Sequence, residues 1–256
     1  MKKLYYIAIM VIVGLSFSTA FGGYIFQEKS TTEMTTPMGT NLSTDYSTIY
    51  IDKGKIKSIN SSDSSGVILR IDKGMLYFVD YAKKTYQEAP VSEIKAMTKS
   101  IMGGDSPRMK EAMKDLPKEQ QDMMKDMMAK MFSPMSVSKT KETKSILGHK
   151  CDKYSISRNG KEVMEIWAAE DLGMGDEYLQ FLEMISPGEN NMFSEFNKIK
   201  GMTMESEMVM DIIGGMKSKN NTVMTDVKET KINPDEFEIP SGFKKEKSDL
   251  SKMLKH

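Results

Sequence analysis

The sequence has little of several residue types on which common functions depend. Its single cysteine, Cys151, excludes a disulfide within the chain. Only two histidines are present, His149 and His256, and a metal site built on His149 and Cys151 would lack its other ligands. The 36 basic residues are balanced by 36 acidic residues. This balance gives no electrostatic reason to expect nucleic acid or an anionic membrane surface as a partner.

Motifs for catalysis and nucleotide binding are also missing from the sequence. It contains no nucleophile elbow, phosphate loop or dinucleotide fingerprint. His149 and Cys151 lie two residues apart on a predicted strand, where neighbours on one face rarely reach the contact that a Cys–His pair needs. A strand cysteine more often packs as a small apolar residue. We therefore expect no enzymatic activity, no catalytic residues, no metal and no cofactor.

Long hydrophobic runs are absent as well. Residues 4–15 are apolar and follow a short basic region, but a membrane-spanning helix needs about 20 such residues. Small residues follow at Ser18, Ala20 and Gly22. The pattern predicts a signal peptide over residues 1–20, cleaved after Ala20 or Gly22, with an uncleaved anchor as the alternative. The protein is expected to be exported to the periplasm or secreted, with no transmembrane segment after cleavage.

Residues 21–245 are expected to form one domain, and residues 246–256 a charged tail. Hairpin turns are indicated by two copies of "IDKG", at Ile51 and Ile71, and by Asn159-Gly160. A regular hairpin around Asn159-Gly160 would place Tyr154 and Trp167 on one face. Helix formers dominate residues 91–135 and 176–199. The order of elements predicts an α+β fold, with a mostly antiparallel sheet and helices gathered on one side as a lid.

Methionine is what the chain has in abundance, with 26 residues. A helix begun near Pro117 would place five of them on one apolar face. A strand after residue 201 would place four more on one face, interrupted by Ser206. Methionine suits a surface that must accept a flexible apolar guest. The predicted ligand-binding residues are therefore Met123, Met124, Met127, Met128 and Met131 on the helix, and Met202, Met204, Met208 and Met210 on the strand.

Two other functions remain open at this point. Thioether sulfur is a suitable ligand for Cu(I), so the chain could be a methionine-rich copper-binding protein. It could also be an envelope interaction protein that docks a partner chain and has no small ligand. The leading hypothesis is a non-enzymatic binding protein for an acyl chain, a lipid or a lipidated protein. The sequence sets neither the ligand, nor the direction of any transfer, nor the oligomeric state.

Four segments carry a resemblance to a known family. They are "DYAKKTYQEA" from Asp80, "ILGHKCDKYSI" from Ile146, "EIWAAEDLG" from Glu165 and "FEIPSGFKK" from Phe237. Over residues 24–245 the chain resembles an uncharacterised family of secreted bacterial proteins, a domain of unknown function. That family is similar in architecture to the Lol-type lipoprotein carriers. The resemblance implies an incomplete antiparallel β-barrel around a hydrophobic cavity, with helices as a lid, and implies a fold more than an activity.

Overall fold

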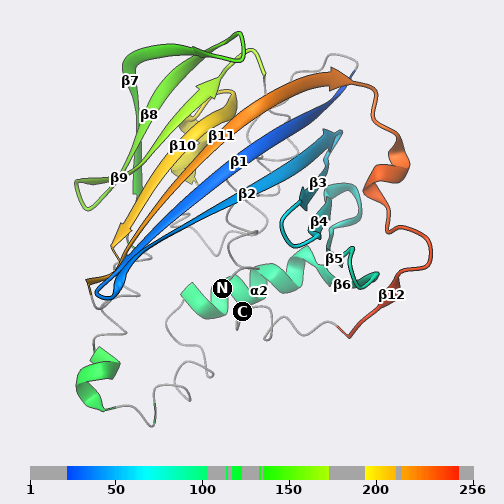
Figure 1. Ribbon diagram of the computed structural model, residues 1–256, viewed down its shortest axis with the longest axis horizontal. Coiled ribbons are helices and arrows are strands. Elements are labelled where there is room, and N and C mark those ends of the chain that lie inside the picture. Colours follow the sequence, from blue (N-terminus) through cyan, green and yellow to red (C-terminus); the bar gives the residue numbers. More distant parts are fainter. Residues whose placement is uncertain are drawn as a thin grey trace.

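The computed structural model describes residues 22–102, 114, 117–122, 133, 135–172, 194–211 and 215–247. Its dominant element is one twelve-stranded sheet (Figure 1). The strands are β1 Gly23–Thr36, β2 Gly39–Asp52, β3 Lys55–Asn60, β4 Ser65–Arg70, β5 Met75–Asp80, β6 Thr85–Pro90, β7 Met135–Ile146, β8 His149–Arg158, β9 Lys161–Ala169, β10 Met202–Asp211, β11 Lys217–Thr230 and β12 Lys244–Lys245. The helices are α2 Val91–Met102 and the 3-10 turns η1 Ile71–Lys73, η2 Ser194–Lys198 and η4 Pro234–Phe237.

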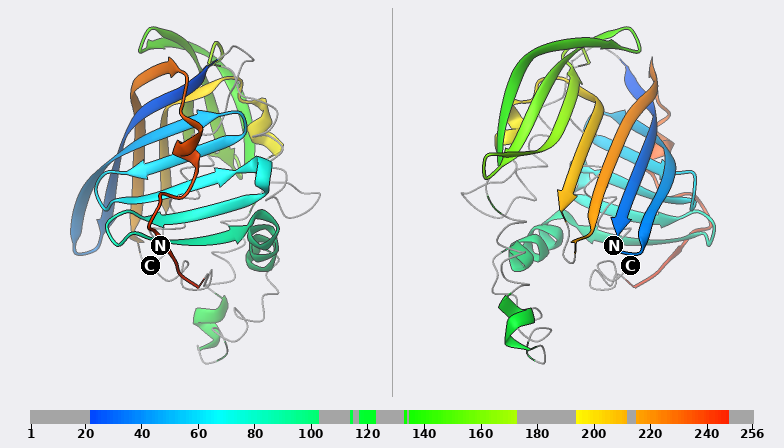
Figure 2. Two further views of the ribbon diagram at one scale, coloured as in Figure 1. Left: turned by 90° about the vertical axis from the view of Figure 1, so that its right-hand side faces the viewer. Right: turned by 60° about the vertical axis from the view of Figure 1, so that its left-hand side comes forward.

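The sheet order is β12-β6-β5-β4-β3-β2-β1-β11-β10-β9-β8-β7. Strands β1 to β6 run in sequence toward one edge, and β7 to β11 run back from the other edge until β11 pairs with β1. Among the described residues, every strand pairing is antiparallel except that of β12 with β6. The sheet is curved and does not close on itself (Figure 2). The predicted mostly antiparallel, curved and incomplete barrel is confirmed, whereas the helical lid stays a prediction.

Turn chemistry forms the predicted hairpins. The first "IDKG" turns through Lys53 and Gly54, with φ of 44° and 71°, and the two-residue loop joins β2 to β3. The second places Gly74 at φ 60° after η1, so this hairpin is confirmed with a longer loop. Asn159 and Gly160, with φ of 52° and 76°, join β8 to β9 as predicted. Positive φ at these positions matches the tight turns that antiparallel strands prefer.

A β-bulge changes one predicted face. The β8–β9 register shifts after Ile156, which pairs with Met164, so Val163 is the extra residue. Tyr154 consequently faces the buried side of the sheet and Trp167 the opposite side. The prediction that these two aromatic side chains share a face is wrong. A bulge moves every later residue to the other face, and the alternation of residue types does not reveal where it occurs.

The sheet has two faces with different covers. We call the inner face the one that carries Phe26 and Ile49, on which α2 and η2 lie (Figure 2). Val91 and Ile94 attach α2 to this core. The outer face is crossed by a C-terminal strap, residues 231–243, which contains the fully buried Phe237 (Figure 2). Burying a side chain of this size stabilises the fold by roughly 1.5–3 kcal/mol, so both faces support the sheet.

The predicted helices are described only in part. α2, Val91–Met102, begins at the position predicted for the first helical segment. A helical turn starts at Pro117, whose carbonyl oxygen accepts from the amide of Gln121 at 3.0 Å. Of the second segment, 176–199, the structure describes only the end, where η2 forms. The continuous helices predicted over 91–135 and 176–199 therefore lie largely outside the described residues.

Candidate functional site

The methionines predicted to bind a ligand divide into two groups. Met123, Met124, Met127, Met128 and Met131 lie outside the described residues. The other four lie on β10, as predicted, and their exposure increases along the strand. Met202 and Met204 are fully buried, Met208 is partly buried, and Met210 is 40% exposed. The strand therefore carries a row of thioethers from the inner core to the surface.

Two more methionines extend this row, and the sequence analysis did not include them. Met164 on β9 lies directly opposite Met208, and Met224 on β11 faces the same core. Both are buried. The alternation of apolar and polar residues did not reveal them, because a bulge lies next to each one. The bulge beside Met164 is in the β8–β9 ladder, and the bulge beside Met224 is in the β1–β11 ladder. The methionine surface is thus built from three adjacent strands, β9, β10 and β11.

Beside the methionines lies a group of buried polar side chains, here called the inner polar patch. Strand pairing places its members on one face of β2, β1, β11 and β10. Their exposed fractions are 7% or less. The patch consists of Glu28, Ser30, Ser47, Ser206, Asn220 and Thr222. Only Ser206 was visible in the sequence, as the polar interruption of the methionine strand.

Hydrogen bonds connect three neutral members of the inner polar patch, Ser30, Asn220 and Thr222. The side-chain amide nitrogen of Asn220 donates to Ser30 Oγ and to Thr32 Oγ1, each at 3.0 Å. Thr222 Oγ1 lies 3.1 Å from Asn220 Oδ1 and 3.3 Å from Ser30 Oγ. All of these contacts except the one between Thr222 and Asn220 cross from β1 to β11. Buried polar groups are costly unless they are bonded in this way, so the network holds the hydroxyl and amide groups in fixed positions.

Glu28 is the ionisable member of the inner polar patch. It lies on β1, opposite Met224 on one side and Ser47 on the other. Its exposed fraction is 2%, and its Oε2 has no hydrogen-bond partner in the described part of the chain. Burial raises the pKa of Glu28 from 4.5 to about 7. A carboxyl group in this setting can exist in both protonation states near neutral pH.

A bulge in β11 determines what stands beside Glu28. Gln27 pairs with Asp226 and Glu28 pairs with Met224, so Thr225 is the extra residue. The hydroxyl of Thr225 donates to the carbonyl oxygen of Gln27 at 3.2 Å, which satisfies the backbone at the irregularity. Bulges commonly redirect side chains next to functional sites. Here the bulge places Met224, in place of Thr225, across from the carboxyl of Glu28.

The candidate nucleophile is not supported by the geometry. Cys151 is fully buried, and its thiol contacts the backbone oxygen of His149 at 3.6 Å. The imidazole Nδ1 of His149 instead lies 2.7 Å from a carboxylate oxygen of Asp171. Burial raises the pKa of Cys151 to about 11. A thiol with such a pKa stays protonated near neutral pH and is a poor nucleophile.

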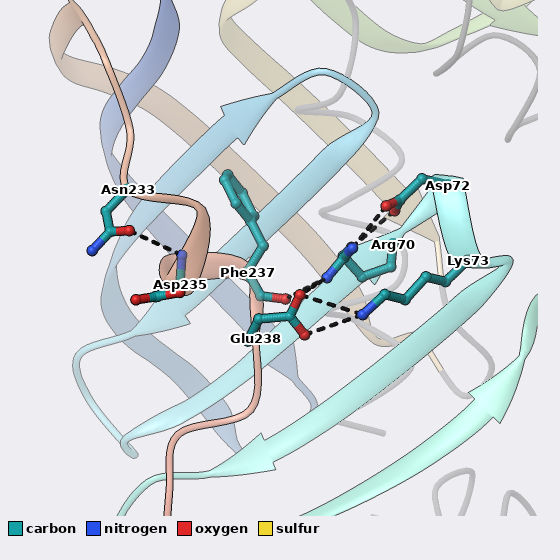
Figure 3. Close-up of polar contacts among 7 residues, drawn as sticks. All are labelled: Arg70, Asp72, Lys73, Asn233, Asp235, Phe237 and Glu238. Carbon is teal, nitrogen blue, oxygen red and sulfur yellow. Dashed lines mark hydrogen bonds and ion pairs between the residues drawn. The ribbon is translucent and has the colours of Figure 1, made fainter.

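Buried charges on the outer face form ion pairs with the C-terminal strap or the adjoining turn (Figure 3). The guanidinium of Arg70 donates to both carboxylate oxygens of Asp72, at 2.7 and 2.8 Å, and also pairs with Glu238. Hydrogen bonding to Arg70 lowers the pKa of Asp72. Lys57 pairs with Glu236 at 2.7 Å. This arrangement fixes the strap to the sheet and gives both buried cations a counter-charge.

Two further features were sought within the described ranges. No group of three or more histidine, cysteine, aspartate or glutamate side chains there is arranged to hold a metal ion. In the same ranges, no helix has the length and apolar character needed to cross a membrane. The inner face, with its methionines and polar patch, is therefore the candidate site that the geometry offers.

Comparison with solved structures finds matches at very low sequence identity and with TM-scores below 0.5. PNGF-II matches 90% of this chain at 12% identity and a TM-score of 0.39, and this chain covers only 32% of PNGF-II, about a third of its length. An uncharacterised conserved protein from Thermus thermophilus matches 96% of this chain and 99% of its own at 7% identity, with a TM-score of 0.42. A LolA superfamily protein from Nitrosomonas europaea matches 90% and 95% at 9% identity, with a TM-score of 0.30.

Similarities with TM-scores below 0.5 carry no information about what this chain binds. A search of the curated proteins finds no relative of the chain. The family described as domain of unknown function DUF4412 matches residues 115–243, about half of the chain. The resemblance to a domain of unknown function, made from the sequence segments, is confirmed. The chain belongs to the DUF4412 family.

Proposed function

We propose that this protein is an exported, non-enzymatic binding protein for an apolar ligand, such as an acyl chain, a lipid or a lipidated protein. The observation that carries the proposal is the methionine row of β10. It begins in the core at Met202 and Met204 and ends at Met210, which is 40% exposed. An apolar chain that enters at Met210 would meet Met208 and then, past Ser206, Met204 and Met202 in the inner core.

The physical properties of methionine support this use. Its unbranched side chain adapts its shape, so it can line a site for guests of variable shape. Burying a methionine contributes roughly 1.5–3 kcal/mol, which a hydrocarbon guest can supply in place of protein contacts. Met208 is suited to such an exchange because it is only partly buried and lies opposite Met164. The exchange would then have a modest net cost.

The proposal includes a lid. We place it in the methionine-rich helical segment within residues 91–135, with Met123, Met124, Met127, Met128 and Met131 turned toward the sheet. Its support is the amphipathic pattern of that segment and the described start of a helical turn at Pro117. The ligand would lie between this segment and the methionines of β10.

Export is part of the same proposal. It is supported by the basic and apolar pattern of residues 1–20 and by the small residues at the expected cleavage site. N-terminal sequencing of protein from the cell envelope should give a chain that begins near Phe21 or Gly23. A chain that still begins at Met1 would contradict cleavage.

The binding proposal is tested on protein purified from its own envelope. Native mass spectrometry, followed by lipid extraction, should show a bound apolar molecule that is released by organic solvent. Met208→Asp should abolish that peak, because it places a charge on the ligand surface. The matched control is Val209→Asp, which alters the neighbouring residue on the opposite face, where Val209 is 41% exposed. Loss of the bound molecule in both variants, or in neither, would contradict a ligand on the inner face.

A further inference from the structure

Glu28 is a buried acid on a central strand of the sheet. β1 lies in the middle of the strand order, with β2 on one side and β11 on the other. Only 2% of Glu28 is exposed, and within the described ranges its Oε2 is left without a hydrogen bond. A buried polar atom without a partner is rare in folded proteins, and each case calls for an explanation. A missing ligand is one such explanation.

The described surroundings of Glu28 contain no cation to neutralise it. By strand register, the inner-facing residues of β1, β2, β10 and β11 in the described structure include no lysine or arginine. The basic residues of β1 and β11, such as Lys29 and Lys219, are exposed on the other face. The raised pKa of Glu28 has burial as its cause, with no contribution from a nearby charge. The carboxylate would therefore be stabilised by any cation brought to it.

The polar neighbours of Glu28 are rich in oxygen atoms that accept hydrogen bonds. Ser47 lies directly opposite Glu28, and Ser30 follows it on the same face, with Thr222 across from Ser30. A protonated amine has three N–H donors and no acceptor. One carboxylate and adjacent hydroxyl oxygens are the complement of that group, and a charge-assisted bond to a carboxylate is about twice as strong as a neutral one.

The apolar neighbours of Glu28 indicate what the amine is attached to. Met224 lies directly across from Glu28, and Met204 and Met208 follow on β10 in the same inner core. A hydrocarbon chain on these methionines would have its polar end at the inner polar patch. The site thus has the two parts that an amphiphile requires, arranged side by side.

We infer that Glu28, with the hydroxyl groups of the inner polar patch, binds the protonated amine of an amphiphilic ligand whose hydrocarbon chain lies on the inner-face methionines. This inference rests on the proposed function and specifies its ligand class. Binding places an ammonium group against the carboxylate, so the buried charge gains the partner that its described surroundings do not provide. A chain with a hydroxyl or carboxylate end would lack this interaction, and a carboxylate end would be repelled.

Three probes of equal chain length test the inference: hexadecylamine, hexadecanol and palmitate. Isothermal titration of the full mature protein should show hexadecylamine binding at least about tenfold more tightly than hexadecanol, with palmitate weakest. Glu28→Gln keeps the size of the side chain and should remove the preference for the amine. Glu33→Gln, on the exposed face of the same strand, should keep it. Circular dichroism verifies that both variants are folded.

A second measurement uses the unaltered protein, in case Glu28→Gln does not fold. Difference infrared spectroscopy at about pH 6 should show a protonated carboxyl band that disappears when hexadecylamine binds and persists with hexadecanol. Equal binding of amine and alcohol, or a band unchanged by the amine, would overturn the inference and leave the proposed function standing. Binding of none of the three probes would overturn both.

Discussion

The two faces of the sheet treat buried charge differently. On the outer face, Lys57 and Arg70 are 6% and 5% exposed, and each is paired with a carboxylate, Glu236 and Glu238 respectively. On the inner face, Glu28 is 2% exposed, and its Oε2 is unpaired among the described residues. Breaking a buried ion pair is strongly destabilising, so the ion pairs on the outer face have a structural role. On the inner face, the buried carboxyl of Glu28 has no counter-charge among the described residues, and such a group is typical of a binding site.

The largest expected effect tests how the C-terminal strap is attached to the outer face. Phe237→Ala removes the most buried aromatic of the strap, which is 1% exposed, and should reduce the free energy of unfolding by about 3–5 kcal/mol. Urea denaturation followed by circular dichroism measures this change. Phe243→Ala, at a partly buried position of the same strap, is the control and should cost less. If both variants have the stability of the parent, the strap is not part of the cooperative fold.

The next effect tests the unpaired acid. The pKa of Glu28 is higher in the folded chain, about 7, than its ordinary value of 4.5. The folded state therefore binds the proton more tightly, and the resulting stabilisation is complete below about pH 4.5 and lost as the pH rises through 7. This difference corresponds to roughly 3 kcal/mol. Glu28→Gln should remove this contribution to the pH dependence and be more stable than the parent above pH 7.

Urea denaturation at several pH values gives this result as the difference between parent and variant. The difference is needed because the lowered pKa values of Asp72, Asp80 and Glu238 add their own pH dependence in both proteins. Glu33→Gln is the control, and its pH profile should follow that of the parent. A difference between parent and Glu28→Gln that stays constant from about pH 4 to 8 would show that the pKa of Glu28 is the same in the folded and unfolded states.

A smaller effect is expected when the partners of a paired charge are removed. Asp72→Asn combined with Glu238→Gln leaves Arg70 buried without a counter-charge. The expected loss is about 2 kcal/mol, since both carboxylates are partly exposed and water can replace some of their contacts. Asp211→Asn, which breaks an exposed pair with Lys161, is the control and should have no measurable effect in thermal denaturation. Equal effects in the two cases would remove the distinction between buried and surface pairs.

The smallest effect concerns the thioethers themselves. Met164→Leu with Met208→Leu keeps the inner face apolar but removes two sulfur atoms. Affinity for a fluorescent apolar probe should change by no more than about threefold, because volume-conserving apolar replacements are well tolerated. Titration of the probe measures this. A variant that loses both tight Cu(I) binding and function would instead support the copper hypothesis, since only the thioether is a soft metal ligand.

Much of the sheet could be predicted because its signals are local. Asn159-Gly160 and the two "IDKG" segments specify tight turns from a few adjacent residues, and all three hairpins are present. In β10 the predicted alternation holds for Met208 and Met210, whereas a register shift between Thr203 and Glu205 interrupts it at Met204. The pairing of Tyr154 with Trp167 failed because one extra residue, in a bulge, leaves no local pattern.

By itself, the sequence determined the turns, the strand faces between bulges, and the abundance of methionine. The tertiary structure alone decided that Glu28 is buried. In the sequence Glu28 precedes Lys29 and looks like an ordinary surface acid. Its neighbourhood is made by β11, where Asn220 bonds to Ser30 across 190 positions of the chain. Turns depend on neighbours along the backbone, whereas burial of a carboxyl depends on which distant strands pair beside it and in which register.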